Sequence, residues 1–232
     1  DTVSVRRLAF GVSRSRSVLD TWVLARLNEL VSDVTKSLDE YEIMNTARSI
    51  EEFVINDFSQ WFLRRSRRRF QKPKTPQEKK EAAETTAYIL VTLAKLIAPF
   101  APFFAEILWH ELKRKMPLKE SSVHLEEWPE LNAKRQTLNA KIIDEMKTVR
   151  EVVAEALKLR AEAGVKVRQP LRELRIKKQE LGERTELLAL IKDEVNVKEV
   201  VLGKELKLDT MITPELREEG LVREFIRNLQ EM

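Results

Sequence analysis

Apolar residues recur every three or four positions over much of the chain's first two thirds, which is the spacing of a buried helix face. From Ser17 to Leu38 this pattern predicts a first helix of about twenty residues. After the turn at "DEYE", a second helix is predicted to carry apolar residues from Ile50 to Phe62 before it reaches a run of arginines. These two segments are expected to open a helical bundle.

Proline and glycine divide the rest of the bundle. The stretch "TPQE", residues 75–78, predicts a helix start, with a threonine N-cap, a proline at the first helical position and a glutamate that completes a capping box. This third helix is predicted to end at "APFAPFF", because proline lacks the amide hydrogen that a helix needs. A fourth helix is expected over about 103–113 and a fifth over about 131–163, where Gly164 supplies the stop.

The hydrophobic period changes after that glycine. "LRELRIK", residues 171–177, alternates as a strand does, and residues 197–208 suggest two short strands joined at Gly203 and Lys204. A helical segment lies between them, and a last helix begins at Thr213. The sequence therefore predicts a mainly α protein, an antiparallel helical bundle over residues 17–163 followed by a small α+β (β-α-β-β-α) unit over residues 164–232.

Composition narrows the possible chemistry. The chain has 34% charged residues and only 5 glycines, which favours helix, and its net charge of +4 comes from interspersed charges that do not by themselves indicate a nucleic-acid ligand. With no cysteine and only two histidines, His110 and His124, a zinc site would need carboxylates as well. No apolar stretch predicts a membrane span, and no glycine-rich phosphate loop, nucleophile elbow or metalloprotease motif is present. We predict no catalytic, cofactor-binding or metal-binding residue.

The strongest local signal is "WFLRRSRRRF", residues 61–70, which places five arginines in six positions. At about 100° per residue, three of them continue the apolar stripe of the second helix and two fall in the neighbouring sector. Such a run is a solvated helix end that the helix dipole favours, a nuclear localisation signal or a surface for RNA phosphates. The tryptophan before it either packs in the core or stacks on a base. The three on the stripe are Arg65, Arg68 and Arg69, the other two are Arg64 and Arg67, and the tryptophan is Trp61.

A second basic stretch, "VKVRQP", residues 165–170, follows the expected end of the long helix. It is predicted to be a loop between helix and strand that exposes Lys166, Arg168 and Gln169. These three residues join the six above as candidates for contact with RNA.

Several stretches resemble one family. "LDTWVLARLNELVSDVTKSLDEYEIMNTARSIEEFVINDFSQWFLRRSRRRF" and "LAKLIAPFAPFFAEILW" resemble helices of the anticodon-binding domain of the class I isoleucyl, valyl and leucyl-tRNA synthetases. "SVHLEEWP" and "AGVKVRQPLRELRI" are most similar to the isoleucyl branch. A valyl relative is expected to end in a heptad coiled coil, whereas this chain switches to strands.

The resemblance implies that the chain holds the anticodon arm of isoleucine tRNA and orients the acceptor end toward a catalytic domain upstream. Residues 1–16 would then be the end of the connection from that domain, which fits a chain that begins with Asp1 rather than methionine. ATP and Mg²⁺ are implied for the catalytic domain only, because the motifs His-Ile-Gly-His and Lys-Met-Ser-Lys-Ser are absent here, as is a cysteine-rich zinc module. The segment alone is expected to be inactive as an isoleucine–tRNA ligase.

Other interpretations remain open at this point. The arginine run could dock on the catalytic domain rather than on RNA. The chain could be the same region of a valyl-tRNA synthetase, or a stand-alone RNA-binding or scaffolding protein. We expect a cytoplasmic monomer with no membrane partner.

Overall fold

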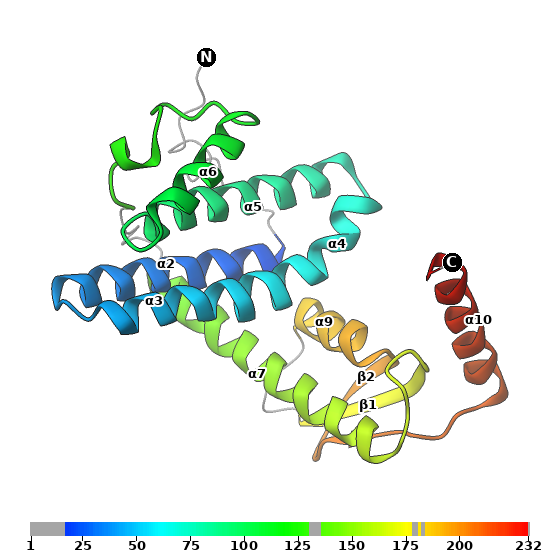
Figure 1. Cartoon of the computed structure of the whole chain (residues 1–232). Helices are drawn as coiled ribbons and strands as arrows, with labels where there is room; N and C mark the ends of the chain where they lie inside the picture. Colours follow the sequence, from blue (N-terminus) through cyan, green and yellow to red (C-terminus); the bar gives the residue numbers. More distant parts are fainter. Residues whose placement is uncertain (1–16, 130–135, 178–180, 182–183, 232) are drawn as a thin grey trace. The chain divides into compact units, whose positions relative to one another are not determined.

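The computed structural model describes residues 17–129, 136–177, 181 and 184–231 (Figure 1). The chain divides into two compact units, the first ending at Ile142 and the second beginning at Ile143. The division falls inside the long helix α7 (Gln136–Glu162). A mainly α architecture with a small α+β unit is therefore confirmed.

The first unit is an antiparallel helical bundle. Ser17 caps the first helix, since its hydroxyl accepts a hydrogen bond from the Asp20 amide at 3.2 Å. Thr75 caps the third in the same way, with the Glu78 amide at 3.1 Å, as predicted. Figure 1 shows the first helix, α2, lying beside α3, which follows it in the sequence. The elements are α2 (Val18–Asp39), α3 (Ile43–Glu52), the π-helix η1 (Phe53–Leu63), α4 (Arg64–Gln71), α5 (Pro76–Ile97) and α6 (Pro102–Lys113).

The helix that carries the arginines runs without a break from α3 through η1 into α4. Its inward positions recur every four residues: Phe53, Asp57, Trp61 and Arg69 are buried, and Arg65 is half-buried. In a regular α-helix four residues overshoot one turn by about 40°, so these positions would drift off one face. In the wider turns of η1 four residues fall slightly short of one turn, which offsets the opposite drift in the α-helical segment α4.

This register corrects the stripe expected from the sequence. A uniform 100° per residue placed Arg65, Arg68 and Arg69 together, whereas in the structure Arg68 is exposed and the other two face the bundle. The prediction was wrong for Arg68, because it assumed α-helical winding through η1 and so misplaced the apolar stripe relative to α4.

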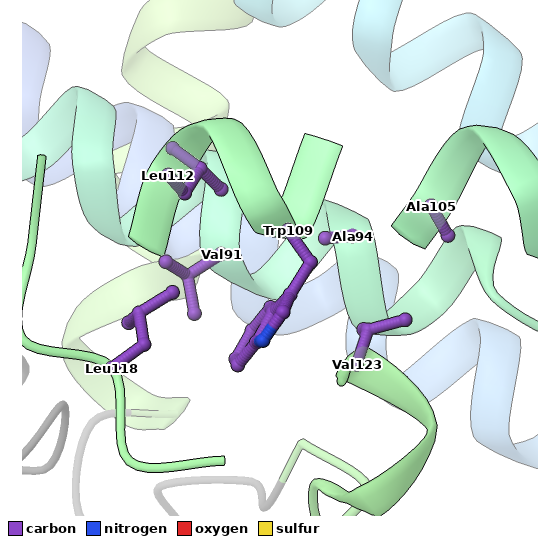
Figure 2. Packing of buried hydrophobic residues seen from close by; sticks show 7 residues of the cluster. All are labelled: Val91, Ala94, Ala105, Trp109, Leu112, Leu118 and Val123. Carbon is purple, nitrogen blue, oxygen red and sulfur yellow. The ribbon is translucent and has the colours of Figure 1, made fainter. Parts of the chain in front are cut away.

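An apolar cluster joins α6 to α5 and to the connection after it (Figure 2). Trp109 is fully buried in the cluster, and its indole nitrogen donates a hydrogen bond to the Glu120 carbonyl at 3.3 Å. The short 3₁₀ turn η2 (Val123–Leu125) brings Val123 against it. The remaining members are Val91, Ala94, Ala105, Leu112 and Leu118.

The second unit contains a three-stranded sheet of order β2-β1-β3. The central strand lies parallel to β2, with the crossover helix α9 between them in sequence, and antiparallel to β3. The two short strands predicted over residues 197–208 are present, but they do not pair with each other, because β1 lies between them. The elements are β1 (Leu171–Lys177), α9 (Thr185–Val195), β2 (Val197–Gly203), β3 (Lys207–Leu208) and α10 (Pro214–Glu231).

Candidate nucleic-acid interface

Three arginines of α4 face solvent. Arg64, Arg67 and Arg68 are all exposed, and we call these three residues the α4 arginine surface. They lie within one turn and a half of helix, so their guanidinium groups bring a charge of +3 to one short segment. Planar guanidinium groups are well suited to bidentate contacts with phosphate.

Arg69 has a different role, because it anchors α4 to α2. Its two terminal nitrogens donate hydrogen bonds to the two carboxylate oxygens of Asp20, at 2.8 and 2.6 Å. The Asp20 side chain is fully buried, and only 9% of the Arg69 side chain is accessible. A paired, bidentate geometry is what allows both charges to be buried. Both ends of the Arg69 guanidinium are thus bound within the bundle, which leaves Arg69 poorly placed for contact with RNA.

Trp61 is also a core residue, with 7% of its surface accessible. The guanidinium carbon of Arg65 lies 3.2 Å from the centre of the indole ring, a cation–π contact. The same guanidinium donates a hydrogen bond to the Trp61 carbonyl at 3.0 Å. The Trp61 ring is buried, and the Arg65 guanidinium covers its face. A base therefore has no open ring face on which to stack.

The second basic stretch forms a turn after α7. Lys166 and Arg168 are exposed as predicted, and Lys166 lies 3.3 Å from Glu224 of α10. Gln169 is not exposed: it is half-buried, and its side-chain amide donates to the carbonyl of Leu216 at 2.6 Å. The expectation for Gln169 failed because α10 returns to cover it, a contact between distant parts of the sequence.

Sequence reasoning missed two residues that organise this turn. Arg160 is fully buried, and its guanidinium donates hydrogen bonds to backbone carbonyls of the turn. Asn196 ends α9 with a φ of 55°, a left-handed conformation that asparagine tolerates, and its side-chain amide also donates to the turn. The sequence offered one signal, because Asn196 separates a helical pattern from a strand pattern, whereas nothing local marks Arg160 as buried.

The two histidine side chains form one small cluster around the carboxylate of Glu106. Among the described residues, no group of three or more histidine, cysteine or carboxylate side chains is arranged to hold a metal ion. Both histidines lie beside one carboxylate, Glu106, with His110 at 3.2 Å and His124 at 3.9 Å. Partial desolvation opposes ionisation of Glu106, but hydrogen bonds from Ser122 and the Val123 amide lower its pKa below the ordinary value. This arrangement links α6 to the connection after it.

No helix in the part of the chain that the structure describes combines the length and the apolar character that crossing a bilayer requires.

Comparison with known proteins defines the class to which this bundle belongs. Residues 20–176, more than half of the chain, match the family described as the anticodon-binding domain of tRNA ligase. The matched region contains all of α4 and extends into β1. The chain belongs to this family.

Isoleucine–tRNA ligases of several bacteria are among the similar proteins. The chain is 39% identical over 209 residues to the "Isoleucine--tRNA ligase" of Thermus thermophilus, which covers 87% of this chain and 20% of that protein. It is 36% identical over 236 residues to the protein of the same name from Dehalococcoides mccartyi, covering 92% of this chain and 23% of the other. It is 37% identical over 193 residues to the "Isoleucine--tRNA ligase" of Clostridium acetobutylicum, covering 83% of this chain and 18% of that protein. The chain thus spans about a fifth of the length of the curated relatives it matches.

Proposed function

We propose that this chain binds the anticodon arm of isoleucine tRNA and that the α4 arginine surface supplies phosphate contacts. The observation that carries the proposal is the separation of roles within one arginine run. Arg69 is buried against Asp20, while Arg64, Arg67 and Arg68 remain exposed on the same helix. Cations on a rigid helix can position an RNA backbone, and bases splayed from a loop can then be read by stacking and edge hydrogen bonds.

The family and the relatives support the choice of ligand. The family description names the anticodon, and the relatives' names specify isoleucine. The valyl alternative has less support, because the three relatives reported above are all isoleucine–tRNA ligases.

The wider activity is part of the same proposal. We propose that the chain serves ligation of isoleucine to its tRNA, with the catalytic steps and the binding of ATP and Mg²⁺ carried by other parts of a synthetase. A cytoplasmic monomer is the state we expect. The isolated chain should show no isoleucine-dependent exchange between ATP and pyrophosphate, and robust exchange would contradict this division of labour.

The test of the RNA-binding proposal is a salt titration. Replacing Arg64, Arg67 and Arg68 together by glutamine should weaken binding to isoleucine tRNA and reduce the slope of log affinity against log salt by about 2, since each phosphate contact contributes about 0.7 to 0.9. A matched control removes three exposed cations from elsewhere on the first unit, at Lys36, Arg114 and Lys115. An unchanged slope in the α4 variant, or an equal change in the control, would remove the α4 arginine surface from the interface.

A further inference from the structure

The second unit contains a buried cation without a buried anion. Arg160 is fully buried at the end of α7, and no carboxylate of the described residues lies within ion-pair distance of it. Burial lowers the pKa of its guanidinium, yet arginine stays charged in proteins. Its Nε is buried with no hydrogen-bond partner among the described residues. A buried charge without a counter-charge is costly, so other polar groups must stabilise the Arg160 guanidinium.

Backbone carbonyls surround the guanidinium in place of a carboxylate. Arg160 donates to the carbonyls of Lys166 at 2.7 Å, Val167 at 3.4 Å and Gln169, and also to that of Val195 at 3.0 Å. The turn that supplies the first three is residues 166–169, which we call the 166–169 turn. Its closing hydrogen bond runs from the Gln169 amide to the Lys166 carbonyl at 3.0 Å.

Asn196 holds the same turn from a second side. Its side-chain amide donates to the carbonyls of Val167 at 2.9 Å and Arg168 at 3.0 Å, and its side-chain oxygen accepts from Arg223 of α10 at 2.8 Å. Two side chains, Arg160 and Asn196, therefore account for every carbonyl of the 166–169 turn. The backbone of the turn is fixed by contacts that lie outside it.

The direction of the carbonyls in the 166–169 turn fixes the direction of its backbone amides. In a planar trans peptide the C=O and the following N–H point in opposite directions, and the described chain contains no cis peptide bond. Because the carbonyls of Lys166 and Val167 point toward Arg160 and Asn196, the amides of Val167 and Arg168 point away from them. Neither amide donates a hydrogen bond to another described residue. Two adjacent N–H donors thus face outward between two exposed cationic side chains, those of Lys166 and Arg168.

We propose that the 166–169 turn is an anion site that seats a phosphodiester of bound RNA on the amides of Val167 and Arg168, flanked by the Lys166 and Arg168 side chains. Successive outward amides form anion-binding sites in other proteins, and the buried Arg160 charge adds a positive field that acts through the turn. Lys166 is available for this, because its pair with Glu224 is solvent-exposed and such pairs are worth only about 0 to 1 kcal/mol. The inference rests on the proposed function, since it takes the phosphate from RNA.

The test removes one amide donor while keeping the turn. Val167 occupies the second position of the turn, where proline is favoured, so Val167→Pro deletes the N–H and Val167→Ala retains it. We expect Val167→Pro to weaken binding of the isoleucine anticodon stem-loop by about tenfold, the value of one hydrogen bond to a charged group. Val167→Ala should stay within about twofold. In the double variant Lys166→Gln and Arg168→Gln, the salt slope should fall by about 1.

A second measurement does not depend on any variant folding. In wild-type protein labelled with ¹⁵N, the amide signals of Val167 and Arg168 should shift on addition of the stem-loop, and in the same direction with inorganic phosphate alone. If the stem-loop binds but these two signals stay in place, the anion site is refuted and the proposed function stands. If no stem-loop or tRNA binds at all, the proposed function itself fails.

Discussion

The α4 arginine surface and the 166–169 turn are both basic stretches, but they hold their charges in different ways. On α4, five arginines follow one helix, and one buried ion pair with Asp20 fixes the helix while three arginines remain exposed. At the turn, the buried arginine comes from the preceding helix and has carbonyls rather than a carboxylate as partners. A buried cation paired with an anion is neutralised, whereas Arg160 contributes its charge to the surface above it. The first region is therefore a side-chain surface, and the second is a backbone site with side chains at its edges.

The largest effect should come from breaking the anchor of α4. Asp20→Asn leaves Arg69 buried without its counter-charge and should cost about 3 to 5 kcal/mol of unfolding free energy, measured by urea denaturation. Asp33→Asn, an exposed change on the same helix, should stay within about 0.5 kcal/mol. Replacing both members of the pair by apolar residues, Asp20→Leu with Arg69→Met, should recover much of the loss. A loss below about 1 kcal/mol for Asp20→Asn would show that the pair does not anchor the helix.

The corresponding change at the turn should cost somewhat less. Arg160→Met removes a guanidinium that satisfies several carbonyls and should destabilise the second unit by about 2 to 3 kcal/mol, because unsatisfied buried carbonyls are costly while the buried charge is relieved. Amide hydrogen exchange of β1 measures this locally. Lys158→Met, an exposed change two residues earlier on the same helix, serves as the control. Equal protection in the two variants would mean that Arg160 does not hold the turn.

A smaller effect tests how α10 supports the turn. A Cβ at Gly220 would collide with the side-chain amide of Gln169, while alanine is favoured over glycine in a helix by about 1 kcal/mol. Gly220→Ala should therefore be close to neutral in the wild type and stabilising by about 1 kcal/mol in a Gln169→Ala background. Chemical denaturation of the four proteins gives the coupling energy, and additive effects would contradict the packing of Gln169 against α10.

The smallest expected effect is a pH dependence of stability that arises from Glu219 of α10. A hydrogen bond from Lys198 at 2.6 Å lowers the pKa of Glu219, with Arg223 contributing as well. A lowered carboxyl pKa means that the stabilisation is present above the unfolded-state value of about 4.3 and is lost as the pH falls through the folded-state pKa. Lys198→Gln should raise the pKa of Glu219 in a ¹³C NMR titration, whereas Lys192→Gln on α9 should leave it unchanged. An unshifted titration in Lys198→Gln would contradict the contact.

The sequence predicted much of the fold because the helices are specified locally. Apolar spacing, the Thr75 cap and the paired prolines each act within a few residues, and the structure confirms the helices that they predict. The strand order could not be predicted, because pairing of β1 with both β2 and β3 depends on contacts distant in sequence.

The candidate site was only partly predictable for the same reason. Local runs of basic residues identified both basic stretches, but the division of α4 into buried and exposed arginines depends on the π-helix and on Asp20, 49 positions away from Arg69. The burial of Arg160 depends on a turn that folds back over it and on Val195 of another helix. The hydrophobic pattern placed Arg69 on an apolar stripe without showing its partner, and it gave no sign that Arg160 is buried.

The central claim, that the chain recognises the anticodon arm of isoleucine tRNA, is tested most directly by competition. A labelled isoleucine anticodon stem-loop bound to the chain is challenged with unlabelled stem-loops that keep the stem and differ only in the three anticodon bases. Splayed bases that are stacked and hydrogen-bonded contribute about 1 to 3 kcal/mol each, so the altered stem-loops should compete at least about tenfold less well than the isoleucine one. Equal competition by all of them would show that the chain binds RNA backbone without reading the anticodon, and would contradict the account.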